Sequence, residues 1–220
     1  MCRCFITDKE IMNEKNLFEQ LDMLKQANAK EFLVRYLKNG YDLCPDAEVA
    51  LFEAKNGQSL VKEYISRHYL CDKAEAKLFE LEEFSVLAMR YIQKHDRLSE
   101  QAQIKMLEHK NAREFVAAYV IFGFDLCRKA QEKIFEHQDV EEIMIIYIQK
   151  HALLVEAQLK MISHAKARKL LKEYFQYYAL DCQAQVQLVK TPNLLDLIIE
   201  YLRAGHSFCY TAQLQLKMAD

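Results

Sequence analysis

The sequence predicts an all-α protein, an α-solenoid that winds into a right-handed superhelix of about seven two-helix repeats. Three observations predict it: an internal repeat of 27–28 residues, apolar stripes with the period of an α-helix, and a chain of 220 residues that holds only 4 Gly and 2 Pro. So little Gly and Pro argues against a β-sandwich, a β-barrel or a glycine-rich phosphate loop. The apolar fraction of 51% and the charged fraction of 28% are those of an ordinary folded chain.

Two columns of residues define the repeat. An alanine followed by Glu or Gln recurs every 27 or 28 residues, at Ala47, Ala74, Ala102, Ala130, Ala157, Ala184 and Ala212. A tyrosine lies 17 residues after each of the first six alanines, at Tyr64, Tyr91, Tyr119, Tyr147, Tyr174 and Tyr201, and Tyr36 extends the column toward the start of the chain. Self-similarity at a fixed period of this length is typical of stacked structural repeats.

These columns set the boundaries of the repeats. The seven repeats occupy residues 19–46, 47–73, 74–101, 102–129, 130–156, 157–183 and 184–211, and residues 212–220 begin an eighth. The first repeat has Glu19 where the others have Ala, as is common in terminal repeats. Residues 1–18 form an N-terminal segment outside the register. Because no linker composition interrupts the repeats, we expect residues 19–220 to form a single α-solenoid domain.

Each repeat is predicted to contain two helices. A short first helix starts near the Ala, and a longer second helix carries the Tyr. Around the Tyr, positions −4, −3, 0 and +1 are apolar, as in Leu60, Val61, Tyr64 and Ile65. These offsets fall on one side of an α-helix. Four residues after the Tyr, the column holds Gly40, Gly123 and Gly205, or His68, His95 and His151, or Tyr178. We expect a left-handed residue there that ends the second helix.

A two-helix repeat cannot bury its apolar stripe alone, whereas stacked repeats can. In this respect the chain resembles, at the level of class, the short HEAT-like helical repeats. The resemblance implies an extended binding surface, and it brings no catalytic motif with it.

The histidines and cysteines are also periodic, and we interpret both sets as structural. His109, His137 and His164 lie seven residues after the Ala, where a helix-end role is favoured over a metal site. Four cysteines lie three residues before an Ala, and Cys182 lies two before. With a spacing of roughly 10 Å between repeats, neighbouring cysteines should be too far apart for a disulfide. Cys2 and Cys4 form an isolated C-x-C pair, which is a weak metal signal.

No catalytic fingerprint, metal site or cofactor site is predicted, and no small-molecule substrate is evident. The leading hypothesis is a non-enzymatic protein that binds a protein partner or scaffolds an assembly. The alternative is a HEAT-like solenoid that binds or processes nucleic acid. A net charge of −2 argues against nucleic acid. The absence of a signal sequence and of a long apolar run predicts a chain without a membrane span, and the odd count of 7 Cys predicts a cytoplasmic one.

The outward positions of the second helices suggest where a partner binds. In most repeats these positions are polar, but two middle repeats break the pattern, which indicates an apolar patch. We expect this patch to form a contact with a partner or in a homodimer, or else to be covered by residues 1–18 or by a neighbouring repeat. The predicted partner-binding residues are Met89, Ala117, Ala118, Ile121, Phe122, Ile145 and Ile146.

The C-terminal stretch is a second open question. Leu214, Leu216 and Met218 have no following helix in the sequence to cover them. Residues 212–220 either cap the array or continue it through another subunit, and we favour capping.

Overall fold

A computed structural model describes residues 15–94 and 97–218. These residues form fifteen α-helices and two short 3-10 helices, and no strand occurs among them. The predicted all-α class is therefore confirmed. The contacts divide the chain into two compact parts, one ending at Lys77 and the other beginning at Leu78, and each part is described by itself. The expectation of a single domain over residues 19–220 stays a prediction.

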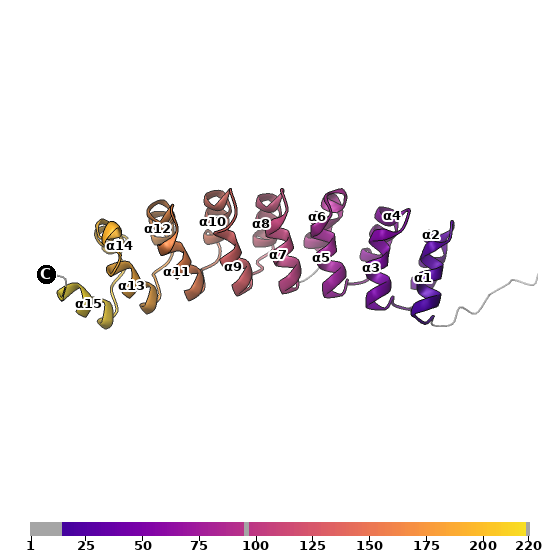
Figure 1. Cartoon of the computed structure of the whole chain (residues 1–220), viewed down its shortest axis with the longest axis horizontal. Coiled ribbons are helices and arrows are strands. Elements are labelled where there is room, and N and C mark those ends of the chain that lie inside the picture. The colour runs from indigo at the N-terminus through magenta and orange to yellow at the C-terminus, as the bar shows by residue number, and fades with distance from the viewer. Residues whose placement is uncertain (1–14, 95–96, 219–220) are drawn as a thin grey trace, which may run out of the picture. The chain divides into compact units, whose positions relative to one another are not determined.

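The N-terminal part contains four helices and the start of a fifth (Figure 1). They are α1 (Leu17–Lys25), α2 (Ala29–Lys38), α3 (Pro45–Glu53), α4 (Gly57–Ile65) and the first residues of α5 (Asp72–Glu80). Each of α1 and α3 contacts the helix that follows it, α1 also contacts α3, and α2 contacts α4. A capping box starts α1: the Asn16 side chain accepts from the Glu19 amide, and the Glu19 carboxylate accepts from the Asn16 amide.

The C-terminal part continues the same alternation of first and second helices. After the end of α5 it contains η1 (Glu82–Phe84), α6 (Ser85–Lys94), α7 (Glu100–Glu108), α8 (Ala112–Ile121), α9 (Arg128–Ile134), α10 (Val140–Ile148), α11 (Val155–Ser163), α12 (Ala167–Phe175), α13 (Cys182–Val189), η2 (Pro192–Leu194), α14 (Asp196–Arg203) and α15 (Tyr210–Lys217).

In this part the helices pack in two rows. The second helices form one row, in which α6 contacts α8, α8 contacts α10, α10 contacts α12 and α12 contacts α14. The first helices α7, α9, α11, α13 and α15 form the other row in the same stepwise manner (Figure 1). Within a repeat, α7 contacts α8 and α11 contacts α12. Neighbouring helices therefore contact one another as expected for a helical repeat.

The two sequence columns lie in the core. The alanines at 47, 74, 102, 130, 157, 184 and 212 are fully buried, and so are all seven tyrosines of the Tyr column. The small Ala side chain lets the first helices approach one another closely, while the Tyr ring fills the space between the two rows.

The second helices end in two different ways. Gly40, Gly123 and Gly205 have φ of +83°, +82° and +87°, which confirms the predicted left-handed glycines. For His68 and His151 the left-handed prediction is wrong, because no residue other than glycine has a positive φ among the described residues. Both imidazoles instead bond through Nδ1 to an aspartate, Asp42 and Asp125 respectively, and each stacks on the Tyr four residues before it. His95 lies outside the described residues.

Candidate protein-binding surface

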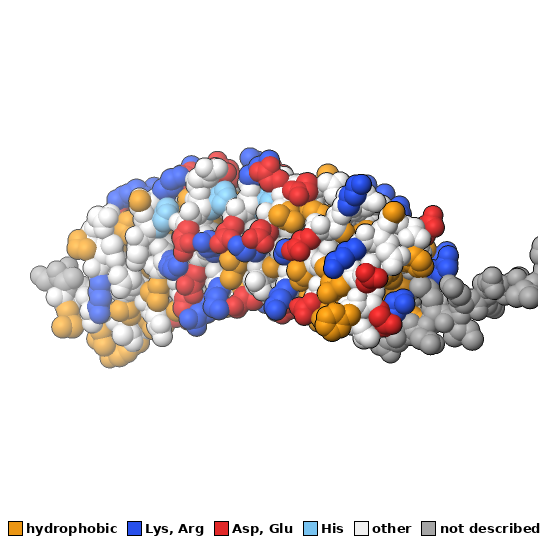
Figure 2. Space-filling model, turned by 45° about the vertical axis from the view of Figure 1, so that its right-hand side comes forward, with side chains coloured by type: hydrophobic (Ala, Val, Ile, Leu, Met, Phe, Trp, Pro, Cys, Tyr) orange, Lys and Arg blue, Asp and Glu red, His pale blue; other side chains and the backbone are white. Residues whose placement is uncertain are grey.

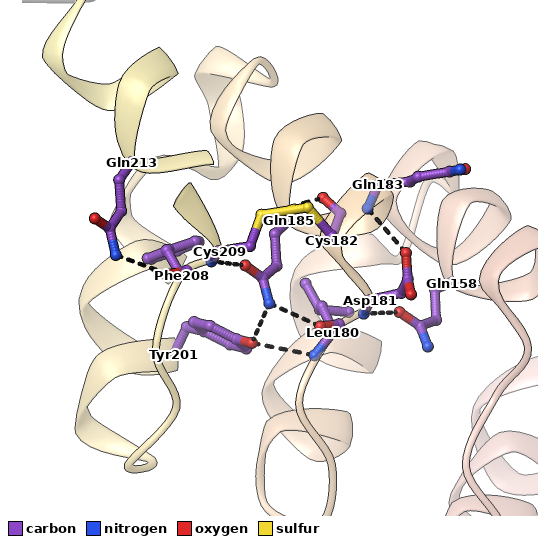
Figure 3. Close-up of a disulfide and its surroundings, with 10 residues drawn as sticks. All are labelled: Gln158, Leu180, Asp181, Cys182, Gln183, Gln185, Tyr201, Phe208, Cys209 and Gln213. Carbon is purple, nitrogen blue, oxygen red and sulfur yellow. Dashed lines mark hydrogen bonds between the residues drawn. A yellow bond between two sulfur atoms is a disulfide. The ribbon is translucent and has the colours of Figure 1, made fainter. Parts of the chain in front are cut away.

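A ladder of buried hydrogen bonds fixes the positions of the second helices. The residue after the Ala is a buried Gln in most repeats, and its amide nitrogen donates to the Tyr hydroxyl of the same repeat. In the last full repeat, Gln185 Nε2 donates to the Tyr201 hydroxyl at 3.2 Å and to the Leu180 carbonyl at 2.8 Å (Figure 3). The Leu180 amide donates to the same hydroxyl at 3.2 Å. One buried amide and one phenol thus join the two helices of a repeat to the loop before them.

The same Gln also joins consecutive repeats. Its carbonyl oxygen accepts from a backbone amide at the start of the next first helix, as Gln185 Oε1 does from Cys209 at 2.6 Å (Figure 3). Equivalent bonds link Gln103 to Cys127, Gln131 to Leu154 and Gln158 to Asp181. The recurrence of Glu or Gln after the Ala was visible in the sequence, but its role in joining repeats was not predicted.

Surface charges on the first helices of the C-terminal part are paired across repeats. Lys133 of α9 contacts Glu108 of α7 at 3.3 Å and Glu136 of its own repeat at 2.9 Å. Lys105 and Lys133 hold the pKa of Glu108 below its ordinary value, first through the Lys105 hydrogen bond. Figure 2 shows positive and negative side chains alternating over the middle of the molecule. This row therefore presents balanced charge.

The histidines of the inter-helix turns act as hydrogen-bond acceptors. The Nδ1 atoms of His109, His137 and His164 each accept from the backbone amide two residues later, at 2.9, 3.0 and 3.1 Å. Burial lowers the pKa of His109, which favours the neutral imidazole that this bond requires. His109 and His164 are the C-caps of α7 and α11, whereas His137 lies two residues beyond the C-cap of α9. No cluster of three or more metal-ligating side chains occurs in the described part of the chain. Cys2 and Cys4 lie outside it.

The predicted partner-binding residues come from three neighbouring second helices. Met89 lies on α6, Ala117, Ala118 and Ile121 lie on α8, and Ile145 and Ile146 lie on α10. Since α8 contacts both α6 and α10, the structure brings these residues to adjacent elements of one row. Phe122 is the C-cap of α8.

Exposure is uneven across this set. Ile121 is 75% exposed and Phe122 48% exposed, whereas the other five residues are half-buried. The two exposed side chains lie next to each other where α8 ends, just before the left-handed Gly123. We call Ile121 and Phe122 the α8 apolar pair. We call the five half-buried residues the base of the patch; they lie on α6, α8 and α10, and α8 contacts both of the other helices.

The expectation that no two neighbouring cysteines can bridge is wrong for one pair. Cys182 and Cys209 form a disulfide with a Cα–Cα distance of 5.7 Å (Figure 3). Cys182 is the first residue of α13, whereas Cys209 is the N-cap of α15. Relative to the Ala of its own repeat, Cys182 lies one residue later than Cys209. This one-residue offset brings the two sulfurs together, because α13 packs directly against α15. Cys44, Cys71 and Cys127 are free thiols.

The N-terminal part contains a cavity that the sequence analysis missed. It has a volume of about 710 Å³ and lies between the α1–α2 turn and the α3–α4 turn, lined by apolar residues such as Leu24 and Leu60 and by polar ones such as Lys25 and Glu53. Ala50 and Ala54 line it at positions where several later repeats carry Lys and His, as at Lys105 and His109. These two breaks in the repeat columns were the available signal.

No helix in the described residues is both long and apolar enough to cross a bilayer. Comparison of the chain with protein-family models, with curated proteins and with solved structures finds no match.

Proposed function

We propose that this chain is a non-enzymatic α-solenoid of seven HEAT-like repeats that binds a protein partner through the second-helix row. The two-row packing of the C-terminal part supports the solenoid, and the hydrogen-bond ladder gives each repeat a fixed place relative to the next. A surface held in this way is preorganised for binding, because little flexibility is lost when a partner docks.

The α8 apolar pair is the observation that carries the partner proposal. Ile121 and Phe122 expose apolar side chains at a position where neighbouring repeats carry Gln and Lys, as at Gln149 and Lys150. Lys150 lies at the end of the adjacent helix α10 and would border the pair with positive charge. An apolar centre with a polar rim is typical of protein-binding surfaces. We therefore expect a partner with an apolar anchor and acidic neighbours.

Balanced surface charge supports a protein partner over nucleic acid. Lys105, Lys133 and Lys160 of the first-helix row each contact a Glu. A duplex would have to displace these carboxylates before it could pair its phosphates with the lysines. We also propose a cytoplasmic location, which the odd count of 7 Cys favours. In that reducing compartment the Cys182–Cys209 pair would be two thiols, and the disulfide would belong to the oxidised form of the chain.

The test replaces an exposed residue so that the fold is not disturbed. In pull-downs from the native cell, the partner captured by the parent chain should be lost with Ile121→Glu, because burying an unpaired carboxylate costs on the order of 100-fold in affinity. Leu154→Glu is the matched control, since Leu154 is 45% exposed at the start of α11, outside the second-helix row. The double variant Ile145→Glu, Ile146→Lys tests the base of the patch. Identical capture by all variants would reject the surface.

A further inference from the structure

The cavity of the N-terminal part lies at a position where other repeats carry a histidine. In the C-terminal part, histidines of this column reach back to the preceding repeat. His109 Nε2 bonds to Ser85 Oγ at 3.2 Å, and the ring centroids of His164 and Phe135 lie 5.9 Å apart. His109 is only 5% exposed, so its imidazole fills the space between the two turns. Position 54 of the same column is Ala, and the equivalent space between the α1–α2 and α3–α4 turns is a cavity.

Most of the cavity lining is apolar. Seven of its twelve lining residues are Leu or Ala. Among them Leu24, Ala29 and Leu60 are buried, whereas Leu21 and Ala54 are half-buried. The volume of about 710 Å³ lies within the range of roughly 300–1,000 Å³ that is usual for ligand sites. The cavity therefore has room for an apolar side chain of the size of Leu or Phe together with its neighbouring groups.

The charged residues of the lining leave two lysines available to a ligand. The lining contains Lys25, Lys55 and Glu53, and all three are exposed. The Glu53 carboxylate already accepts from Lys77 Nζ at 2.8 Å. In the described part of the chain, no carboxylate forms an ion pair with Lys25 or Lys55, and Asp22 of α1 does not line the cavity. An acidic ligand could thus pair with both lysines without breaking an internal ion pair.

Two side-chain amides favour a peptide over a fatty acid as that ligand. Gln26 and Asn56 line the cavity and are exposed. Asn56 is the N-cap of α4, but its side chain makes no capping hydrogen bond. A side-chain amide both donates and accepts, so it matches the N–H and carbonyl groups of a peptide backbone. A fatty acid has only its carboxylate to offer to these groups.

We propose that the cavity between the α1–α2 and α3–α4 turns binds a short acidic peptide segment of a partner protein. An apolar side chain of the segment fills the cavity, its carboxylates pair with Lys25 and Lys55, and its backbone bonds to Gln26 and Asn56. This site lies in the N-terminal part of the chain and does not rest on the α8 apolar pair, which belongs to the C-terminal part.

A defined peptide tests the site on the full chain at physiological salt. The probe is a fluorescein-labelled peptide in which one Phe is flanked on both sides by glutamates, and fluorescence anisotropy measures its affinity. The parent chain should bind it, and replacing the Phe by Ser or the glutamates by glutamines should weaken binding. Octanoate at the same concentration should not displace the probe. Displacement would identify a site for a free apolar acid and overturn the peptide assignment.

Filling the cavity gives the sharpest variant. Ala54→His introduces the residue that this column carries in three later repeats. It should weaken probe binding on the order of 10- to 100-fold, because the apolar anchor can no longer be buried. If Ala54→His does not fold by circular dichroism, Ala54→Leu replaces it, since Leu81 occupies this column in the next repeat. Affinity equal to that of the parent in a folded filling variant would overturn the proposal.

Charge reversal gives an independent measurement. Lys25→Glu combined with Lys55→Glu should weaken probe binding on the order of 10-fold. The matched control combines Lys38→Glu with Lys62→Glu, because these exposed lysines of α2 and α4 lie outside the lining. Ile121→Glu should leave the affinity unchanged, so failure of this proposal and failure of the proposed function are separable. A parent chain that does not bind the probe, or binding that Ile121→Glu abolishes and the filling variants do not, would overturn the proposal.

Discussion

At the residue scale, one buried polar side chain in each repeat carries the ladder, and at position 48 this side chain is ionisable. Glu48 accepts from the Tyr64 hydroxyl at 2.9 Å and from the Cys71 amide. Burial raises its pKa, and the bonds from Cys71 and Tyr64 offset only part of that shift. The folded chain therefore favours the protonated carboxyl. Its contribution to stability is complete at pH values below the ordinary carboxyl pKa and is lost as the pH rises through the raised value.

The first prediction follows from the raised pKa of Glu48. Glu48→Gln should stabilise the chain at pH 7 by roughly 1 kcal/mol, because an uncharged amide can make the bonds that Gln makes in other repeats. The gain should shrink as the pH falls toward 4, where Glu48 is protonated. Thermal unfolding from pH 4 to 7 measures it, with the exposed Glu31→Gln as control. A gain that does not change with pH would contradict the assignment.

The second prediction concerns Tyr119. Its hydroxyl accepts from the Leu98 amide at 3.1 Å and from Gln103 Nε2 at 3.4 Å. Tyr119→Phe leaves both buried donors without this acceptor and should cost about 1–3 kcal/mol of unfolding free energy. Tyr119→Ala should cost about 3 kcal/mol or more, because it also leaves a cavity. Urea unfolding checks both values, and Tyr177→Phe on the surface should change little. An unaltered urea midpoint for Tyr119→Phe would show that the Tyr119 hydroxyl does not stabilise the ladder.

At the element scale, the starts of consecutive first helices determine where the chain can be cross-linked. The natural disulfide joins the first residue of α13 to the N-cap of α15. Glu100 is the first residue of α7, and the free Cys127 is the N-cap of α9. In both pairs the N-cap amide donates to the Gln of the preceding repeat, at 2.6 Å. The two pairs of helix starts are therefore held in the same way.

The third prediction uses this equivalence. Glu100→Cys should form a disulfide with Cys127 and raise the unfolding free energy by about 3 kcal/mol, as expected for a loop of this length. Glu100→Ser removes the same Glu100–Lys129 ion pair without adding a thiol, so it is the matched control. Mass spectrometry of the oxidised protein detects the bond, and a reducing agent should abolish the gain. If both thiols stay free after oxidation, the one-residue offset between consecutive helix starts does not determine where a disulfide can form.

At the scale of the whole molecule, the sequence predicted the features that follow the repeat period. It could not predict the features that depend on contacts between particular side chains. The Ala and Tyr columns identified the buried faces correctly, because burial follows the helical period. The left-handed φ predicted for His68 and His151 was wrong. His151 bonds to Asp125 of the preceding repeat, and the sequence does not show this contact between repeats. Likewise, Ile121 and Ile145 look alike in sequence, and only packing shows that the first is exposed and the second half-buried.

The hydrogen-bond ladder also has a consequence for cooperativity. Each Gln carbonyl of the ladder joins one repeat to the next and to no repeat further away, so the coupling free energy between repeats is made of nearest-neighbour terms. Local unfolding of α15 then leaves the Gln131–Leu154 bond intact. Unfolding can spread only by breaking the Gln hydrogen bonds between consecutive repeats one after another. Amide hydrogen exchange should therefore show the repeats opening in separate steps with different rates, and not as one cooperative unit.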